Sequence, residues 1–145
     1  MIESKRLSVV KPTVHTRYHI DFDWWRKNDR DWRVYLQSYL CPQHQESFQD
    51  AREGELIDWV DPQTAEVQRV DGLQHVLISH CAQQPDFITQ RTSMVDAVFR
   101  IFLSNGNTAL SCEELAERLN RPADTILRTL SGIRVYKGLR PIMEG

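Results

Sequence analysis

The sequence predicts an α+β protein in which a small strand–helix–hairpin–helix unit packs against a second, mainly helical region. Three observations predict this class. An early stretch alternates polar and apolar residues, later stretches repeat apolar residues every three to four positions, and two β-branched runs flank a proline-containing turn. The 145 residues are 41% hydrophobic and 26% charged, which is the composition of a folded globular protein.

The first two predicted elements are a strand and a helix. Apolar residues alternate with polar ones from Val14 to Trp24, as is typical of a half-buried strand. Asn28 or Asp29 can then cap a helix. Pro42 would stop this helix, because the residue before proline disfavours the α region. The apolar stripe of the helix consists of Trp32, Tyr35, Leu36, Tyr39 and Leu40.

A hairpin and a second helix follow. Leu56–Val60 and Ala65–Val70 are predicted strands, because the Asp-Pro step between them suits a type I turn. Asp71 can cap the next helix, and Pro85 would end it. The inward stripe of that helix consists of Leu73, Val76, Leu77, His80, Cys81 and Gln84.

The stretch 85–92 is the predicted boundary, which divides the chain into a first unit at 1–88 and a second at 89–145. Ser93 and Asp96 are spaced as a capping box and predict the start of a helix just beyond it. Gly106 would end that helix. Its inner face consists of Val95, Val98, Phe99 and Phe102.

Two shorter helices and a hairpin complete the second unit. Ser111 and Glu114 are spaced as another capping box. Pro122 suits the first turn of the next helix, and Gly132 would end it. The segment Ile133–Ile142 alternates loosely around a Lys-Gly turn signal and predicts a hairpin.

The stretch LAERLNRPADTILRTLSG and the hairpin after it resemble the winged-helix branch of helix-turn-helix proteins. The resemblance is sharpest at the Leu115-Ala116 pair, at Leu119 and at Arg128. It implies that the helix at 122–131 enters the major groove of DNA and that the hairpin follows the backbone. The residues that would contact DNA are Arg121, Thr125, Arg128, Thr129, Arg134, Lys137 and Arg140.

Charge favours the same surface. The net charge of −2 gives no general attraction to nucleic acid, so binding would depend on a local patch. Between Arg121 and Arg140 there are five cations and one acid, Asp124, whereas the preceding helix carries three glutamates and one arginine. We therefore expect a non-enzymatic, DNA-binding protein of transcriptional regulation. The alternative is that the same fold serves as a protein–protein interaction module or assembly adaptor.

The tryptophans favour an interface. Trp24 and Trp25 are neighbours in the predicted strand and would point to opposite faces, so one would be exposed or covered by a partner. Helix-turn-helix proteins often act as dimers. A homodimer or a protein partner is therefore a further expectation.

Cysteine and histidine predict a metal site. Cys41 and His44 form a C-x-x-H pair, which can hold one tetrahedral ion from a single turn. The expected partners are His80 and Cys81, 36 positions after His44, because both lie on the inward stripe of their helix and His75 does not. Four protein ligands would make a closed, structural zinc site. The alternative is that the thiols are only buried and the imidazoles bond to nearby carbonyl groups.

A weaker pattern suggests an enzyme. His19, Asp21 and Asp23 are spaced two residues apart on the predicted strand, where they could bind a divalent ion as nucleases do. A solvated polar strand face is the favoured explanation, because such residues are common there. The sequence contains neither a glycine-rich phosphate loop nor a G-x-S-x-G nucleophile motif, so catalysis is the lesser alternative.

The chain is expected to be cytoplasmic, with no membrane partner. Its apolar runs fall short of the ~20 residues that span a bilayer. Its first residues lack the pattern of a signal peptide. Three cysteines, an odd number, argue against a disulfide framework in that compartment.

Overall fold

A three-stranded antiparallel sheet joins the early part of the chain to its late part. The computed structural model describes residues 11–47, 56–60, 62–132, 135 and 137–142. Strand β1 (Arg17–Ile20) lies between β4 (Leu110–Ser111) and β5 (Leu139–Pro141). Tyr18 is paired with Leu110 on one side and with Pro141 on the other. The α+β class is confirmed, and one sheet is shared by strands from both predicted units.

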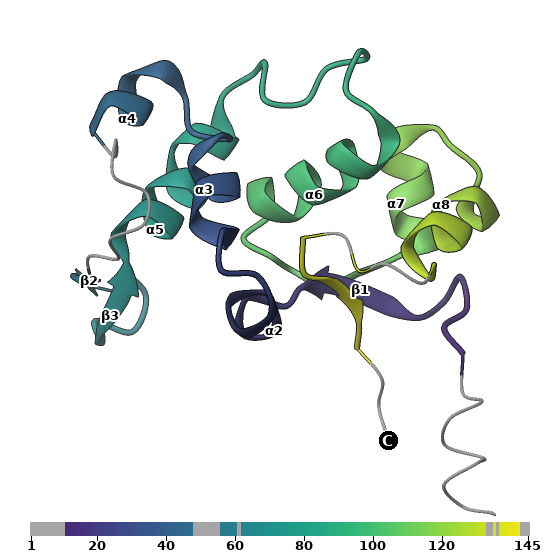
Figure 1. Ribbon diagram of the computed structural model, residues 1–145, viewed down its shortest axis with the longest axis horizontal. Helices are drawn as coiled ribbons and strands as arrows, with labels where there is room; N and C mark the ends of the chain where they lie inside the picture. Colours follow the sequence, from purple (N-terminus) through teal and green to yellow (C-terminus); the bar gives the residue numbers. More distant parts are fainter. Residues whose placement is uncertain (1–10, 48–55, 61, 133–134, 136, 143–145) are drawn as a thin grey trace, which may run out of the picture.

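Helix α6 (Met94–Ser104) lies at the centre of the molecule (Figure 1). The helices α3 and α5 lie on one side of it and α7 and α8 on the other, while β1 packs beneath it. Its residues are buried or half-buried along its whole length, so it contributes to the core on both sides. The buried side chains of α6 are Ala97, Val98, Phe99, Ile101, Phe102 and Leu103.

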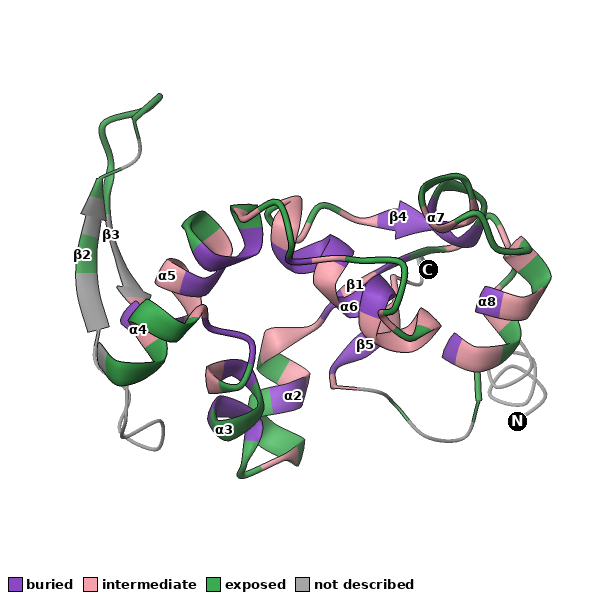
Figure 2. Cartoon of the chain, turned by 90° about the horizontal axis from the view of Figure 1, so that it is seen from above, coloured by how far each residue is buried: buried purple, intermediate pink, exposed green. Residues whose placement is uncertain are grey.

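The side of the molecule before α6 consists of short elements. The hairpin of β2 and β3 projects from the body, and α4 beside it is largely exposed (Figure 2). This two-stranded sheet is separate from the sheet of β1. The elements are α2 (Phe22–Asn28), α3 (Trp32–Gln37), α4 (Pro42–Ser47), β2 (Leu56–Val60), β3 (Val67–Asp71), α5 (Gly72–Ser79) and the 3₁₀ turn η1 (Cys81–Gln83).

The strand predicted from Val14 to Trp24 is shorter, and its second half is helical. β1 ends at Ile20, and Asp21 caps α2 by accepting a hydrogen bond of 3.0 Å from the Trp24 backbone N–H. The cap lets α2 turn Trp25 inward, where 1% of it is exposed and its ring meets that of Phe99 edge to face. The two neighbouring tryptophans therefore lie on a helix.

Both helices predicted in the first unit end early. The first begins at Trp32 and ends at Gln37, and Pro42 opens α4 instead of only stopping α3. The second keeps its predicted cap, since Asp71 accepts from the Gln74 N–H at 3.0 Å. It ends at Ser79, ahead of Pro85, because His80 leaves the helical region with φ −124° and ψ −63°.

The side after α6 follows the prediction closely. Helix α7 (Cys112–Leu119) begins with the predicted capping box, in which Ser111 and Glu114 exchange hydrogen bonds of 3.0 and 3.2 Å. Asn120 ends it with φ +55°, and α8 (Ala123–Leu130) follows two residues later. Gly106 ends α6 with φ +72°, as predicted.

The capping box predicted from Ser93 and Asp96 does not form. The Ser93 side chain makes no capping bond. The carboxylate of Asp96 accepts instead from the Tyr39 hydroxyl at 2.5 Å and from Arg100 Nε at 2.7 Å. Arg100, one turn later in the same helix, and Tyr39, from the turn after α3, compete successfully for this carboxylate, because a hydrogen bond from a charged donor is stronger than one from a neutral donor.

The hairpin predicted at 133–142 is replaced in part. Lys137 and Gly138 form the predicted turn with φ +43° and +78°, and β5 follows them. β5 pairs with β1, however, and Val135 is in no strand. Ile133, Arg134 and Tyr136 lie outside the described residues. A Cβ at Gly138 would approach Trp25 Cβ to 3.0 Å, so this turn packs tightly against α2.

Among the described helices, none combines the length and the apolar character that a bilayer crossing requires.

Candidate metal centre and basic surface

Three of the four side chains predicted as metal ligands, Cys41, His44 and His80, come together in the structure, and Cys81 contacts the first two of them. Cys41 Sγ lies 3.1 Å from His44 Nδ1 and 3.3 Å from Cys81 Sγ. Cys81 Sγ lies 3.6 Å from the same His44 nitrogen. The ring of His80 completes the group, with its centroid 4.7 Å from that of His44. The ligand atoms of Cys41, His44 and His80 all lie within 4.8 Å of one another, so this group could hold a metal ion.

The first two of these residues are placed by the start of α4. The Cys41 carbonyl accepts from the backbone N–H groups of His44 and Gln45, each at 2.9 Å. Pro42 stands at the first helical position, where its fixed φ favours the turn and its missing N–H costs nothing. One turn of chain therefore brings the thiol and the imidazole to the same side.

The other two residues are placed by the end of α5. On a continuous helix, neighbouring side chains diverge by about 100° and could not share an ion easily. His80 breaks the helix, and Cys81 begins η1 immediately afterwards. Because the helix is broken at His80, the two neighbouring side chains are not held to the divergence of a continuous helix.

The distances resemble those of an ion-binding site. In a tetrahedral site with Zn–S of ~2.3 Å and Zn–N of ~2.0 Å, neighbouring ligand atoms lie roughly 3.3–3.8 Å apart. The three contacts among Cys41, His44 and Cys81 fall between 3.1 and 3.6 Å. These three contacts are therefore close to the spacing of metal ligands, and the ligand atom of His80 lies within 4.8 Å of those of Cys41 and His44.

Burial also affects the chemistry of the thiols. Cys81 is 1% exposed, and burial raises the pKa of its thiol to about 11. A buried thiolate is costly unless a cation lies against it, and a bound metal ion is such a cation. Cys41 is half-buried and His80 is exposed, so an ion could reach the group from solvent.

The predicted DNA-contacting residues of α8 are on the surface. Arg121 and Arg128 are exposed, while Thr125 and Thr129 are half-buried and joined by a hydrogen bond of 3.0 Å from the Thr129 hydroxyl to the Thr125 carbonyl. The opposite face of α8 is buried, with Ile126 fully inside. Among the described residues, no acid lies within ion-pair distance of either arginine.

Two other predicted DNA contacts are engaged within the molecule. Lys137 Nζ donates to the Tyr39 hydroxyl and lies 3.9 Å from Asp96, and burial lowers the pKa of this lysine. Arg140 donates to Asp21 Oδ2 at 3.1 Å and stacks 5.2 Å above the Trp24 ring. The charges of Lys137 and Arg140 are thus partly neutralised by acidic residues of the same chain. Arg134, also predicted, lies outside the described residues.

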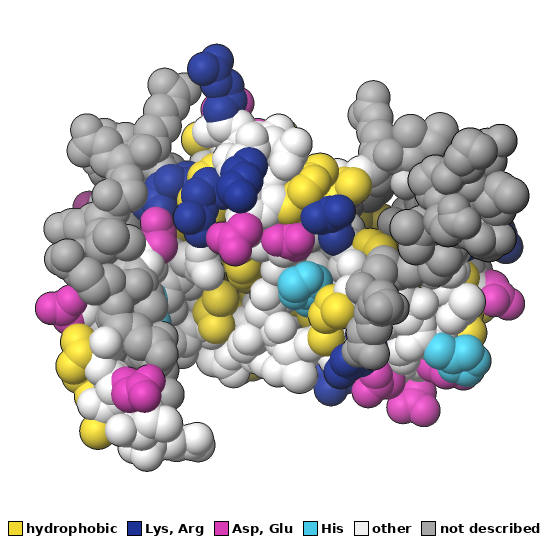
Figure 3. All heavy atoms as spheres, turned by 90° about the horizontal axis from the view of Figure 1, so that it is seen from below, with side chains coloured by type: hydrophobic (Ala, Val, Ile, Leu, Met, Phe, Trp, Pro, Cys, Tyr) yellow, Lys and Arg dark blue, Asp and Glu magenta, His cyan; other side chains and the backbone are white. Residues whose placement is uncertain are grey.

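Sequence reasoning missed a second basic group. Arg26, Lys27 and Arg30 are exposed on α2 and on the turn after it. Of these three, only Arg26 forms an ion pair within the described part of the chain, with Asp23 at 3.6 Å. Lys and Arg side chains gather on the underside of the molecule with Asp and Glu between them (Figure 3). The spacing of these three cations over five positions was the available signal.

The carboxylates of the enzyme alternative do not assemble. His19 lies on β1, opposite Arg140. Asp21 caps α2, and Asp23 lies exposed in the first turn of that helix. The predicted strand face that would align the three residues does not exist, because the strand ends before Asp21.

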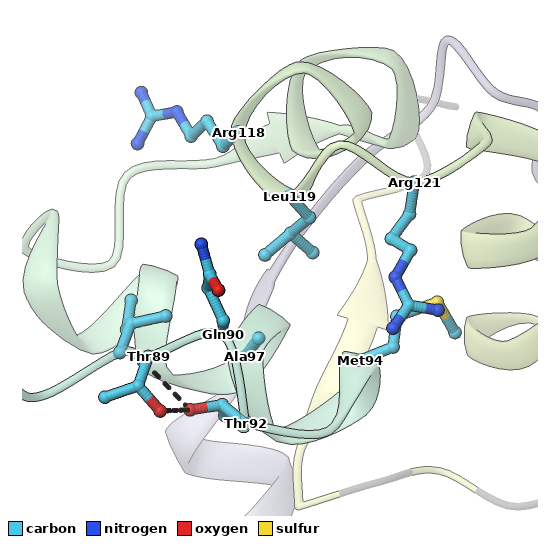
Figure 4. Close-up of a pocket in the computed structure, with 9 residues that line it drawn as sticks. Thr89, Gln90, Thr92, Met94, Ala97, Arg118, Leu119 and Arg121 are labelled. Atoms are coloured by element: carbon cyan, nitrogen blue, oxygen red, sulfur yellow. Dashed lines mark hydrogen bonds between the residues drawn. The ribbon is translucent and has the colours of Figure 1, made fainter.

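A depression of about 360 Å³ lies where the segment 88–92 meets α6 and the end of α7. Thr89, Gln90 and Met94 line it together with Leu119. Figure 4 shows the Arg121 side chain reaching toward Met94, and that of Arg118 extending away from the hollow. Both arginines border the α7–α8 connection, so they extend the basic edge of α8.

Comparison of the chain with protein-family models, with curated proteins and with solved structures finds no match.

Proposed function

We propose that Cys41, His44, His80 and Cys81 bind one zinc ion at a closed structural site. The observation that carries the proposal is the meeting of two pairs of residues that are far apart in the sequence, with sulfur and nitrogen atoms 3.1–3.6 Å apart. Two thiolates and two imidazoles form a ligand set that suits zinc. Zinc would supply a fixed divalent charge that holds both thiolates ionised.

The ion would act as a cross-link. Helix α4 has six residues and is mostly exposed, so its own packing gives it little stability. A bond from its first turn to the end of α5 would fix it against the buried Leu73 and Leu77 of that helix. With four protein ligands, no position remains for a substrate or a reactive water, and the site would have no catalytic role.

Metal analysis of the purified protein tests this proposal. One zinc ion per chain is expected for the natural protein, and Cys41→Ser should lose it and melt at a lower temperature. Cys112→Ser is the matched control for zinc content, because Cys112 is a fully buried thiol that is not among the ligands. Absence of stoichiometric zinc, or full retention of zinc by Cys41→Ser, would refute the site.

For the biological role, we propose DNA binding in transcriptional regulation without catalysis. The order helix, strand, helix, helix, strand from α6 to β5 supports the resemblance to winged-helix proteins. The carrying observation is that Arg128 on α8 and Arg121 just before that helix are exposed, while the opposite face of α8 is buried. Helix α8 would enter the major groove, with Thr125 and Thr129 near the bases or the phosphates.

Duplex binding at several salt concentrations tests this role. Changing both Arg121 and Arg128 to Ala should weaken binding and reduce the slope of log affinity against log salt by about 2. Lys27→Ala, an exposed cation on α2, is the matched control and should leave the slope unchanged. Equal affinity of the double variant and the natural protein would remove DNA as the ligand of α8.

A protein-interaction module is the second candidate, and two observations favour it. Lys137 and Arg140 form ion pairs with acidic residues of the same chain, which reduces the positive charge of the surface. The hairpin also exposes apolar side chains, with Val60 56% and Val67 64% accessible. A chain that ignores duplex DNA, yet sediments as a homodimer that Val60→Asp with Val67→Asp makes monomeric, would support this candidate.

A further inference from the structure

Two of the four candidate ligands form a close pair of thiols. Cys41 Sγ and Cys81 Sγ are 3.3 Å apart, although the residues are 40 positions apart in the sequence. This is about the contact distance of two sulfur atoms, and a disulfide needs an approach to ~2.05 Å. The third thiol, Cys112, lies at the start of α7 beyond α6 and is fully buried. The fold therefore selects one pair from the three cysteines.

The two thiols differ in access. Cys41 is half-buried at the first turn of an exposed helix, whereas Cys81 is 1% exposed. A small oxidant from solvent would meet Cys41 first and leave Cys81 behind it as the nearest thiol. An accessible sulfur with a second thiol in contact is the arrangement that favours a disulfide over further oxidation of the first sulfur.

We propose that Cys41 and Cys81 are a site of oxidative modification, at which a hydroperoxide converts the metal-binding pair into a disulfide and releases the ion. The proposal rests on the zinc site for the release and on the sulfur contact alone for the disulfide. The junction between the first turn of α4 and the beginning of η1 would then have two alternative cross-links, the zinc ion and the disulfide.

The chemistry balances in two steps. The Cys41 sulfur attacks one peroxide oxygen, so that an S–O bond forms, the O–O bond breaks, and the leaving oxygen takes a proton to become water. The Cys81 sulfur then attacks the Cys41 sulfur, so that the S–S bond forms, the S–O bond breaks, and a second water leaves. The two sulfurs lose two electrons in total, and hydrogen peroxide gains them. From the zinc-bound pair, two protons are taken up and the free ion departs.

The disulfide would keep the junction closed. Zinc and disulfide both tie the first turn of α4 to the beginning of η1 across the same connection of 40 positions. The difference lies in the histidines, because His44 and His80 would lose their shared ligand when the ion leaves. Helix α4 would therefore remain attached while the two imidazoles become free.

The test uses the full chain, reduced, loaded with zinc and then treated with hydrogen peroxide without reductant. A colorimetric chelator should report release of one zinc ion per chain, and the intact mass should fall by about 2 Da relative to reduced metal-free protein. Peptide mapping should place the bond between Cys41 and Cys81, and a thiol reductant should restore zinc binding. Cys112→Ser should behave in the same way, and Cys41→Ala should form no intramolecular bond.

The same treatment of metal-free protein separates this proposal from the zinc site. A disulfide between Cys41 and Cys81 without any zinc binding would refute the zinc site and support the thiol pair. Zinc binding with an oxidised mass that rises by about 16 Da or more, or with a bond that includes Cys112, would overturn the thiol pair alone. An unchanged mass after peroxide has been consumed would overturn it as well.

Discussion

The two sides of α6 are held together in different ways. On the side of α7 and α8, the helices are capped or separated by well-formed turns, and Leu115 and Ile126 are fully buried. On the opposite side, α4 is short and exposed, and the β2–β3 hairpin carries exposed valines. A two-stranded hairpin is marginally stable by itself. Apolar side chains are buried beside α6 on both sides, so α4 and the hairpin are the parts that the proposed zinc cross-link at Cys41 and Cys81 would stabilise.

The largest expected loss of stability comes from a substitution in α6, the helix against which both sides pack. Phe102 is fully buried in α6. Phe102→Ala should lower the free energy of unfolding by about 3–5 kcal/mol, because a large cavity would open in the common wall. Urea unfolding followed by tryptophan fluorescence measures this loss. A loss below about 1 kcal/mol would mean that α6 is not the shared core.

Removal of the metal should change amide hydrogen exchange on one side of α6 and not on the other. After a chelator extracts zinc, amide hydrogen exchange in α4 and in the β2–β3 hairpin should speed up at least tenfold, which corresponds to about 1.4 kcal/mol of local opening. Exchange in α6 and α7 should change little, since apolar burial holds them. Uniform acceleration along the chain would contradict a local role of the ion.

Loss of the N-terminal cap of α7 should lower stability only on the side of α7 and α8. Ser111 accepts from the Glu114 N–H and completes the capping box of α7. Ser111→Ala should cost about 1 kcal/mol of stability, with no change in zinc content. Chemical denaturation and metal analysis on the same preparation measure both quantities. A loss of zinc in this variant would show that the two sides are coupled more closely than the account allows.

The smallest effect concerns the charged group that joins the sides. Burial would raise the pKa of Asp96, but hydrogen bonds from Tyr39 and Arg100, with the charges of Arg100 and Lys137, outweigh it and hold the pKa below its ordinary value. A carboxyl whose pKa is lowered on folding contributes stability above its unfolded pKa, ~3.9, and loses it as the pH falls through the folded value.

The matching variant is Asp96→Asn. It should be less stable than the natural protein at pH 7, by about 1 kcal/mol or less, and the difference should shrink below about pH 4. Urea unfolding between pH 3 and pH 7 follows this convergence. A difference that is constant over that range would show that the carboxylate charge contributes nothing.

Local signals explain what the sequence predicted correctly. The capping box of Ser111 and Glu114, the end of α6 at Gly106 and the hairpin turn near Pro62 depend on residues a few positions apart. Cys41, His44 and Cys81 also meet as predicted, because a C-x-x-H pair constrains its own turn and the predicted helix leads to Cys81. The break at His80 was not predicted.

Pairing between residues far apart in the sequence explains what could not be predicted from the sequence. Asp96 takes Tyr39, 57 positions away, in place of Ser93, and Arg140 takes Asp21, 119 positions away. Lys137 turns inward for the same reason, since its partners come from the turn after α3 and from α6. No pattern of neighbouring residues encodes such pairs. The second half of the strand and the Ser93 capping box were therefore predicted wrongly, and the internal partners of Lys137 and Arg140 were not predicted.

X-ray absorption at the zinc edge of the purified, reduced protein tests the central claim most directly. We expect one zinc ion with two sulfur ligands at ~2.3 Å and two nitrogen ligands at ~2.0 Å, supplied by Cys41, Cys81, His44 and His80. A first shell made only of oxygen and nitrogen, or a single sulfur, would contradict it.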